Sequence, residues 1–254
     1  MFRHHAFTLA EMAVVVIVVS IALVIAVAVQ SPRTHSRRPS RNSTQVRGIQ
    51  QGMATFASGN GGFYPGLDST GKLLPAIPAS ATTYGAAAPT NADQSIVYAI
   101  MLTNSFFTPD YAVSPSEVDP LIKPAPGISA AATIDQRHYS YALLQFAGPD
   151  NAGRRLEWKA TENSQCPAVT DRSKAIDPIL TTTSIHTTAT GSDSATWEGN
   201  VAWNDNHVTF ETTGIIPAGK TKIGTAMAEG VDDLFLAAPV KGLAPDGDAK
   251  MTYR

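Results

Sequence analysis

The chain has 254 residues, enough for one good-sized domain with an added segment or for two small domains. Its formal net charge is -2 and only 16% of its residues are charged, which excludes a strongly basic nucleic-acid-binding protein. The single cysteine, Cys166, excludes an internal disulfide and a cysteine zinc cluster. We interpret it as a small, partly buried side chain.

The first predicted element is an uncharged run at residues 12–29, in which Ser20 is the only polar residue. As a helix rising about 1.5 Å per residue it would span roughly 27 Å, close to the ~30 Å hydrocarbon core of a bilayer. Its many β-branched residues weaken a helix in water, but in lipid every backbone group must bond internally. The run therefore predicts a transmembrane helix. A cleaved secretory signal, with Ala26 and Ala28 near its end, is the alternative.

One acidic residue, Glu11, stands directly before this run. A carboxylate at the edge of a membrane span is costly without a partner. The N-terminal amine of a neighbouring subunit would be such a partner if cleavage just before Phe7 exposed it. In the alternative interpretation Glu11 lies among lipid headgroups, where the helix dipole favours an acid at the helix start.

Residues 7–11, Phe-Thr-Leu-Ala-Glu, and the apolar run behind them resemble the prepilin N-terminus of type IV pilins and type II secretion pseudopilins. The resemblance implies that a prepilin peptidase cleaves between Ala6 and Phe7 and methylates the new amine of Phe7. It also implies that Glu11 sets the register between subunits in a filament. The family usually has Gly before the cut, where this chain has Ala6.

The charges around the run conflict with this resemblance. Five arginines follow it within residues 33–47, and the positive-inside rule would place that side in the cytoplasm. The resemblance places it outside, and we follow the resemblance. The predicted location is a single-pass protein of the inner (cytoplasmic) membrane, with the C-terminal head in the periplasm or outside the cell.

Beyond the run, Pro32 and Pro39 predict a break in the chain, so residues 31–44 are interpreted as an Arg- and Pro-rich linker. Apolar residues at helical spacing predict a short helix over residues 45–57, ended by the Gly-rich residues 58–62.

Later segments predict strands. Residues 138–146 are typical of a strand, and residues 201–203 and 208–210 flank a turn-type cluster, which predicts a hairpin. Residues 96–103 fit a short helix or a strand. The predicted fold class is α+β: an N-terminal transmembrane helix, then a pilin-like globular head with a short helix packed on a mostly antiparallel sheet. The predicted organisation is a leader peptide (1–6), a transmembrane or polymerisation helix (7–30), the linker (31–44) and the head (45–254).

The head resembles one branch of this family, the planctomycete-type pseudopilins, whose C-terminal domain carries a spaced His and Asp-Gly pair. The motif residues here are His186, Asp205 and His207, with Asn206 in place of the family's Gly. Further matching segments are residues 61–65, 113–117, 140–142, 171–173 and 199–208.

His186, Asp205 and His207 would suit a transition metal if they converged. The preferred interpretation is structural, because Asp is common in turns, where it hydrogen-bonds the backbone. The sequence has no phosphate-binding glycine loop and no G-x-S-x-G motif. We predict no catalytic residue, cofactor or metal, and no enzymatic activity.

The expected function is that of a structural pilin or pseudopilin subunit of a type IV pilus-like or type II secretion-like filament. The alternative is a minor or tip subunit whose loops, residues 59–92 and 104–130, bind a secreted substrate or a surface. The expected partners are prepilin peptidase, other pilin or pseudopilin subunits, an inner-membrane assembly platform and membrane lipid, but not nucleic acid.

Overall fold

A computed structural model describes residues 34–75, 77, 84–85, 93–127, 132–147, 152–173, 197–217, 219–224, 226–227, 232–235 and 251–252. Nearly all of them belong to one compact unit, Arg38–Arg254. Residues 34–37 fall in a second unit, Met1–Arg37. The predicted leader and the predicted membrane helix, residues 1–30, lie outside the described residues.

The centre of the unit is a five-stranded sheet in the order β11-β3-β4-β5-β6, in which every neighbouring pair is antiparallel. Its strands are β3 (Tyr141–Leu144), β4 (Pro167–Asp171), β5 (Gly199–Trp203), β6 (Val208–Glu211) and β11 (Met251–Thr252). Every residue of β3, β4 and β5 is buried, so both faces of the central strands are covered. The prediction of a mostly antiparallel sheet is confirmed.

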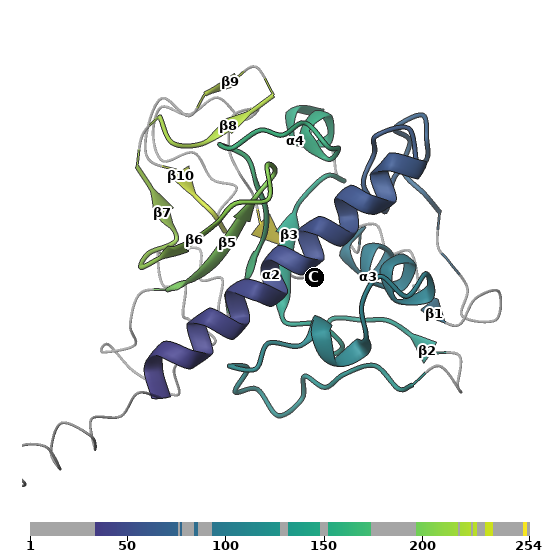
Figure 1. Cartoon of the computed structure of the whole chain (residues 1–254). Coiled ribbons are helices and arrows are strands. Elements are labelled where there is room, and N and C mark those ends of the chain that lie inside the picture. Colours follow the sequence, from purple (N-terminus) through teal and green to yellow (C-terminus); the bar gives the residue numbers. More distant parts are fainter. Residues whose placement is uncertain are drawn as a thin grey trace, which may run out of the picture. The chain divides into compact units, whose positions relative to one another are not determined.

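One long helix, α2 (Thr34–Gly59), crosses a face of this sheet (Figure 1). Val46, Ile49 and Met53 recur every three to four residues and are completely buried, as an apolar stripe on one face requires. The helix ends where predicted: the Gly62 N–H donates to the Ala57 carbonyl at 2.8 Å. Gly61 and Gly62 have positive φ, which glycine adopts without strain.

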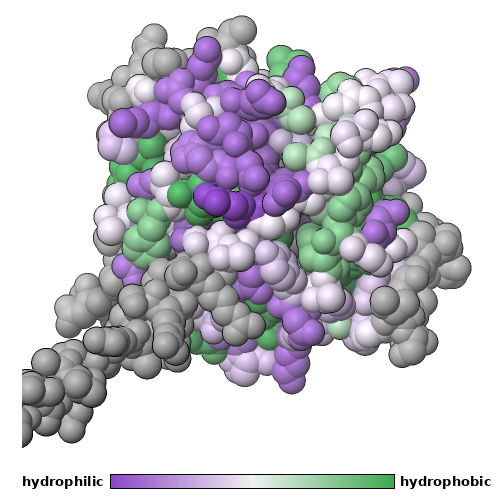
Figure 2. All heavy atoms as spheres, viewed as in Figure 1, coloured by the Kyte–Doolittle hydropathy of each residue, from purple (hydrophilic) through white to green (hydrophobic). Residues whose placement is uncertain are grey.

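Short elements surround the sheet and α2. They are β1 (Tyr84–Gly85), α3 (Asp93–Thr103), η2 (Pro109–Ala112), β2 (Ala132–Thr133), α4 (Ala152–Glu157), β7 (Ile215–Ile216), β8 (Lys222–Ile223), β9 (Ala226–Met227) and β10 (Asp232–Asp233). β1 and β2 pair in parallel, whereas β7 pairs with β10 and β8 with β9 antiparallel. Hydrophilic side chains gather over α4 and the tip of the β5–β6 hairpin, and apolar ones beside α3 (Figure 2).

The predicted fold class needs correction. Among the helices in the described residues, none combines the length and the apolar character that crossing a bilayer demands. α2 has 26 residues, but arginines 37, 38, 41 and 47 and many other polar residues lie within it. The fold prediction that joined a transmembrane helix to the head is therefore contradicted. The structure shows a small α+β head with an antiparallel sheet.

The helix of the head is also longer than predicted. It begins at Thr34 and continues through Pro39, where a linker over residues 31–44 was expected. A proline removes one N–H and crowds one carbonyl, so it weakens a helix locally without always ending it. Side-chain hydrogen bonds from Asn42 onward fasten the next turns to the sheet and offset that cost.

Replacing Gly199 by Ala is expected to destabilise the head by roughly 1–3 kcal/mol, the usual cost of overpacking. A Cβ atom there would lie 2.7 Å from Cζ2 of Trp197 and 2.8 Å from Cβ of Asp171, closer than two carbon atoms can pack. Urea denaturation followed by tryptophan fluorescence would measure the loss. Gly59→Ala is the matched control, because nothing lies within 4 Å of its Cβ position. Equal stability of the two variants would contradict the crowding at Gly199.

Candidate functional site

The predicted hairpin is confirmed: β5 and β6 pair antiparallel, with Val201 opposite Thr209. Asn206 has a φ of 67°, a conformation that Asn tolerates better than most residues. In the turn, the His207 N–H donates to Oδ1 of Asp205 at 3.1 Å. This is the backbone hydrogen bond expected of an Asp in a turn.

Two of the three head-motif residues are described, and they lie together. Oδ1 of Asp205 is 2.5 Å from Nδ1 of His207, and both side chains are partly exposed. His186 lies outside the described residues. Within the described part of the chain, no group of three or more His, Cys, Asp or Glu side chains is placed to hold a metal ion.

A buried carboxylate, Asp171 at the end of β4, connects α2 to two strands. Nδ2 of Asn42 on α2 lies 2.6 Å from each of its oxygens. The backbone N–H of Asn200 on β5 donates to Oδ2 at 2.7 Å, and its side-chain amide donates at 3.1 Å. Charge-assisted bonds of this kind are among the stronger hydrogen bonds in proteins.

Hydroxyl groups extend this cluster around Asn42. Tyr141 on β3 donates to Oδ1 of Asn42 at 2.8 Å, and Ser114 donates to the same oxygen at 3.0 Å. Burial, and secondly the negative charge of Asp171, raises the pKa of Tyr141 well above its usual range. Tyr141 therefore stays protonated and acts as a hydrogen-bond donor.

The residue after Asp171 forms a buried ion pair. Nε of Arg172 lies 2.9 Å from Oε2 of Glu117, and its terminal nitrogen Nη2 lies 2.7 Å from Oε1. The two side chains are only 5% and 3% exposed, so this two-point contact is shielded from solvent. It fixes the loop after η2 to the end of β4.

A second polar cluster fastens the C-terminal half of α2. Nε2 of Gln50 donates to the hydroxyl of Tyr64 at 2.9 Å, and Tyr64 donates to Oδ1 of Asn204. The Asn204 amide in turn donates to the carbonyls of Glu157 and Lys159 at 2.9 and 3.0 Å. Burial raises the pKa of Tyr64, which keeps its hydroxyl neutral.

These two clusters and the buried ion pair join segments that the sequence resemblance had singled out separately. The residues concerned are Tyr64, Ser114, Glu117, Tyr141, Asp171, Arg172, Asn200 and Asn204. Sequence reasoning missed their partners on α2 for two reasons. Asn42 fell in the predicted linker, and Gln50 lay in a predicted helix, where a polar residue usually indicates an exposed face. Most of these amides and hydroxyls pair with one another or with Asp171, whereas Oε1 of Gln50 is buried without a hydrogen-bond partner among the described residues. The chemistry is that of fixing a helix to a sheet.

The predicted processing and register residues, Ala6, Phe7 and Glu11, lie outside the described residues. No family model, curated protein or solved structure matches this chain.

Proposed function

We propose that this chain is a pilin or pseudopilin subunit of a type IV pilus-like or type II secretion-like filament. The observation that carries the proposal is the placement of Phe7 and Glu11 directly before the uncharged residues 12–29. The described head is compatible, because it is a small α+β unit whose first helix is α2.

The chemistry of assembly follows from these residues. Cleavage before Phe7 by a prepilin peptidase frees an amine, which the Glu11 carboxylate of a neighbouring subunit pairs with. Before assembly the apolar residues 12–29 contact lipid, and in the filament the same residues pack against neighbouring subunits. Extraction of the subunit from the membrane therefore exchanges apolar contact with lipid for apolar contact with protein. The subunit waits in the inner membrane until an assembly platform moves it into the filament.

A second candidate function is a minor or tip subunit whose head binds a secreted substrate or a surface. The loop after η2 favours it, because Leu121 is 71% exposed and Val118 is 38% exposed. The buried pair of Glu117 and Arg172 holds the same loop in place. Apolar side chains presented on a fixed loop are typical of recognition surfaces.

Replacing Glu11 by Ala is expected to abolish filament assembly while leaving membrane insertion unchanged. The variant loses the carboxylate that pairs with the neighbouring amine, but it keeps the apolar run. Electron microscopy of filaments and membrane fractionation measure the two properties. Glu11→Asp is the matched control, because it keeps the charge and is expected to retain partial assembly.

Mass spectrometry of the mature N-terminus tests the same proposal independently. A chain that begins at a methylated Phe7 supports it. An intact Met1, a cut after residues 26–30, or normal filaments from the Glu11→Ala variant would each contradict it.

A further inference from the structure

Strand β6 forms one edge of the five-stranded sheet and, among the described residues, pairs with β5 alone (Figure 1). Asn200 of β5 lies opposite Phe210 of β6. Its N–H donates to Oδ2 of Asp171 and its carbonyl accepts from Oγ1 of Thr170, so both groups are directed toward β4. Because an antiparallel ladder alternates, Phe210 and Val208 direct their own N–H and C=O groups away from β5. These outward groups make no backbone hydrogen bond in the described part of the chain.

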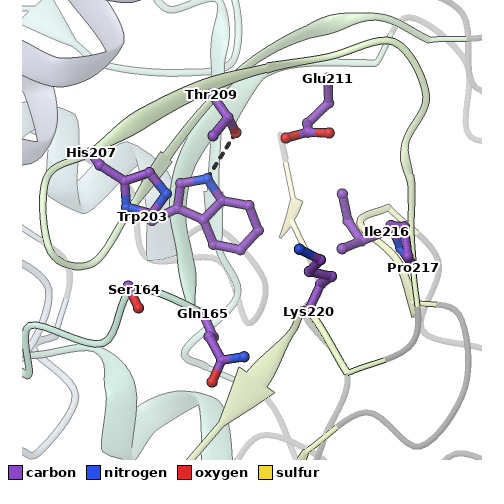
Figure 3. Close-up of a pocket in the computed structure, with 9 residues that line it drawn as sticks. All are labelled: Ser164, Gln165, Trp203, His207, Thr209, Glu211, Ile216, Pro217 and Lys220. Atoms are coloured by element: carbon purple, nitrogen blue, oxygen red, sulfur yellow. Dashed lines mark hydrogen bonds between the residues drawn. The ribbon is translucent and has the colours of Figure 1, made fainter.

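The side chains along this edge are accessible. Figure 3 shows His207, Thr209 and Glu211 extending from one face of the hairpin strand. Val208 and Phe210 therefore lie on the other face, because side chains alternate along a strand. Phe210 is 45% exposed, and the side chain of His207 is 42% exposed. Natural sheet edges are usually protected by lysine, proline or a bulge, and the Val-Thr-Phe centre of β6 has none of these.

A second copy of the chain fits this edge in one register. In an antiparallel ladder between two β6 strands, outward backbone groups must face outward groups, which excludes every shift by a single residue. Val208 of each copy can lie opposite Phe210 of the other, and this register engages all the outward groups of both strands. A shift by two residues pairs Val208 with Val208 or Phe210 with Phe210 and leaves half of these groups without a partner inside the strand.

The side chains are complementary in the same register. On one face Val208 lies opposite Phe210 of the second copy, an apolar cross-strand pair that occurs twice. On the other face Thr209 lies opposite Thr209 at the centre, and His207 lies opposite Glu211 of the second copy. Nδ1 of His207 already has a carboxylate partner within its own turn, which leaves Nε2 for a second one. An imidazolium donates from both nitrogens, so the two strands are complementary in charge.

We propose that two copies of this chain pair through β6, which joins their five-stranded sheets into one continuous sheet about a two-fold axis at Thr209. Such a contact closes at two copies, whereas the contacts that build a filament repeat in one direction. The pairing therefore goes beyond the proposed filament function. The contact is small, so we expect a weak dimer with a dissociation constant of about 100 µM in detergent. Confinement in a membrane raises the effective concentration of the two copies.

Disulfide trapping in the full-length chain in detergent tests the pairing. The one native cysteine, Cys166, is buried. Thr209→Cys places two thiols in a non-hydrogen-bonded pair, whose Cα atoms lie about 4.5 Å apart and can be bridged. Copper–phenanthroline is the oxidant, and non-reducing gels measure the covalent dimer. We expect it to form at least about tenfold faster than from Ser69→Cys, a control with its thiol on an exposed loop, because pairing raises the effective thiol concentration.

Two further variants test the register. Val208→Cys and Phe210→Cys should each form few covalent dimers alone, because like positions are diagonal neighbours about 7–8 Å apart, too far for an unstrained disulfide. A mixture of the two should form dimers readily, because Val208 and Phe210 lie opposite each other at a Cα distance of about 5.5 Å. Circular dichroism verifies folding, and the mixture decides the question if Thr209→Cys does not fold.

A charged edge should prevent the pairing. Phe210→Lys, added to Thr209→Cys, introduces the residue that protects natural sheet edges and should slow dimer formation at least about fivefold. Three results would overturn the proposal: Thr209→Cys no faster than Ser69→Cys, equal dimer formation by the three β6 cysteine variants when each is alone, or an unchanged rate with Phe210→Lys. None of these measurements involves a filament, so the pairing can fail while the filament function holds, and the reverse.

Discussion

Replacing Asp171 by Ala is expected to lower the free energy of unfolding of the head by about 4 kcal/mol. The change leaves the Asn42 amide and both nitrogens of Asn200 buried without their acceptor. Each unsatisfied buried donor costs roughly 1–3 kcal/mol, and the contributions of neighbours in one network are not simply additive. Urea denaturation of the full-length chain measures the effect.

Two companion variants make this result specific. Asp171→Asn keeps the size of the side chain and one acceptor oxygen, so it should destabilise less than Asp171→Ala. Asp110→Ala makes the same chemical change on the exposed first turn of η2 and should leave the unfolding midpoint nearly unchanged. A loss for Asp171→Ala no greater than that for Asp110→Ala would contradict the role of Asp171 in holding α2.

Breaking the buried ion pair is the second large effect. Arg172→Met leaves the Glu117 carboxylate, only 3% exposed, without the two-point contact that neutralises it. Removing one partner of a buried pair typically costs about 3–5 kcal/mol, because the remaining charge stays poorly solvated. We expect a loss of this size in denaturation experiments, together with greater exposure of the loop after η2 to proteases.

The double variant Glu117→Gln/Arg172→Met tests whether the two side chains stabilise the head as a pair. With both charges removed, the loss should be clearly smaller than the sum of the two single losses. Arg137→Met is the control, because Arg137 also makes a two-point contact, with Asp135, but on the surface. It should leave the unfolding midpoint unchanged within error. Additive losses in the double variant would show that Glu117 and Arg172 act independently.

Elements with a clear repeat were predictable from the sequence. The hairpin was predicted because apolar residues on both sides frame a turn cluster, and the paired strands β5 and β6 confirm it. The C-terminal half of α2 was predicted from the spacing of Val46, Ile49 and Met53, which are all buried. In both cases the signal is local and lies within about a dozen residues.

Other elements carried no such signal. β4 lies at the centre of the sheet, but its five residues are buried on both faces, so they show no alternation of apolar and polar side chains. The first turns of α2 were interpreted as a linker because Pro39 lies within them. Proline is a strong local signal, and here the tertiary contacts of the following turns override it.

The contacts of the candidate site were beyond sequence reasoning for a different reason. Asn42 and Asp171 are 129 positions apart, and Glu117 and Arg172 are 55 apart. The sequence resemblance drew attention to several of these segments one by one. The local pattern of a segment does not predict which side chains will contact one another, because those contacts depend on the packing of the whole sheet.

The order of strands in the sheet has a consequence for synthesis. β11 pairs with β3, so residues 251–252 occupy one edge of a sheet whose other strands are translated some forty or more residues earlier. Until β11 arrives, the outer hydrogen-bonding groups of β3 are a template for any extended chain nearby. The interval between translation of β6 and of β11 is therefore when the emerging head is most prone to aggregate and has most need of a chaperone.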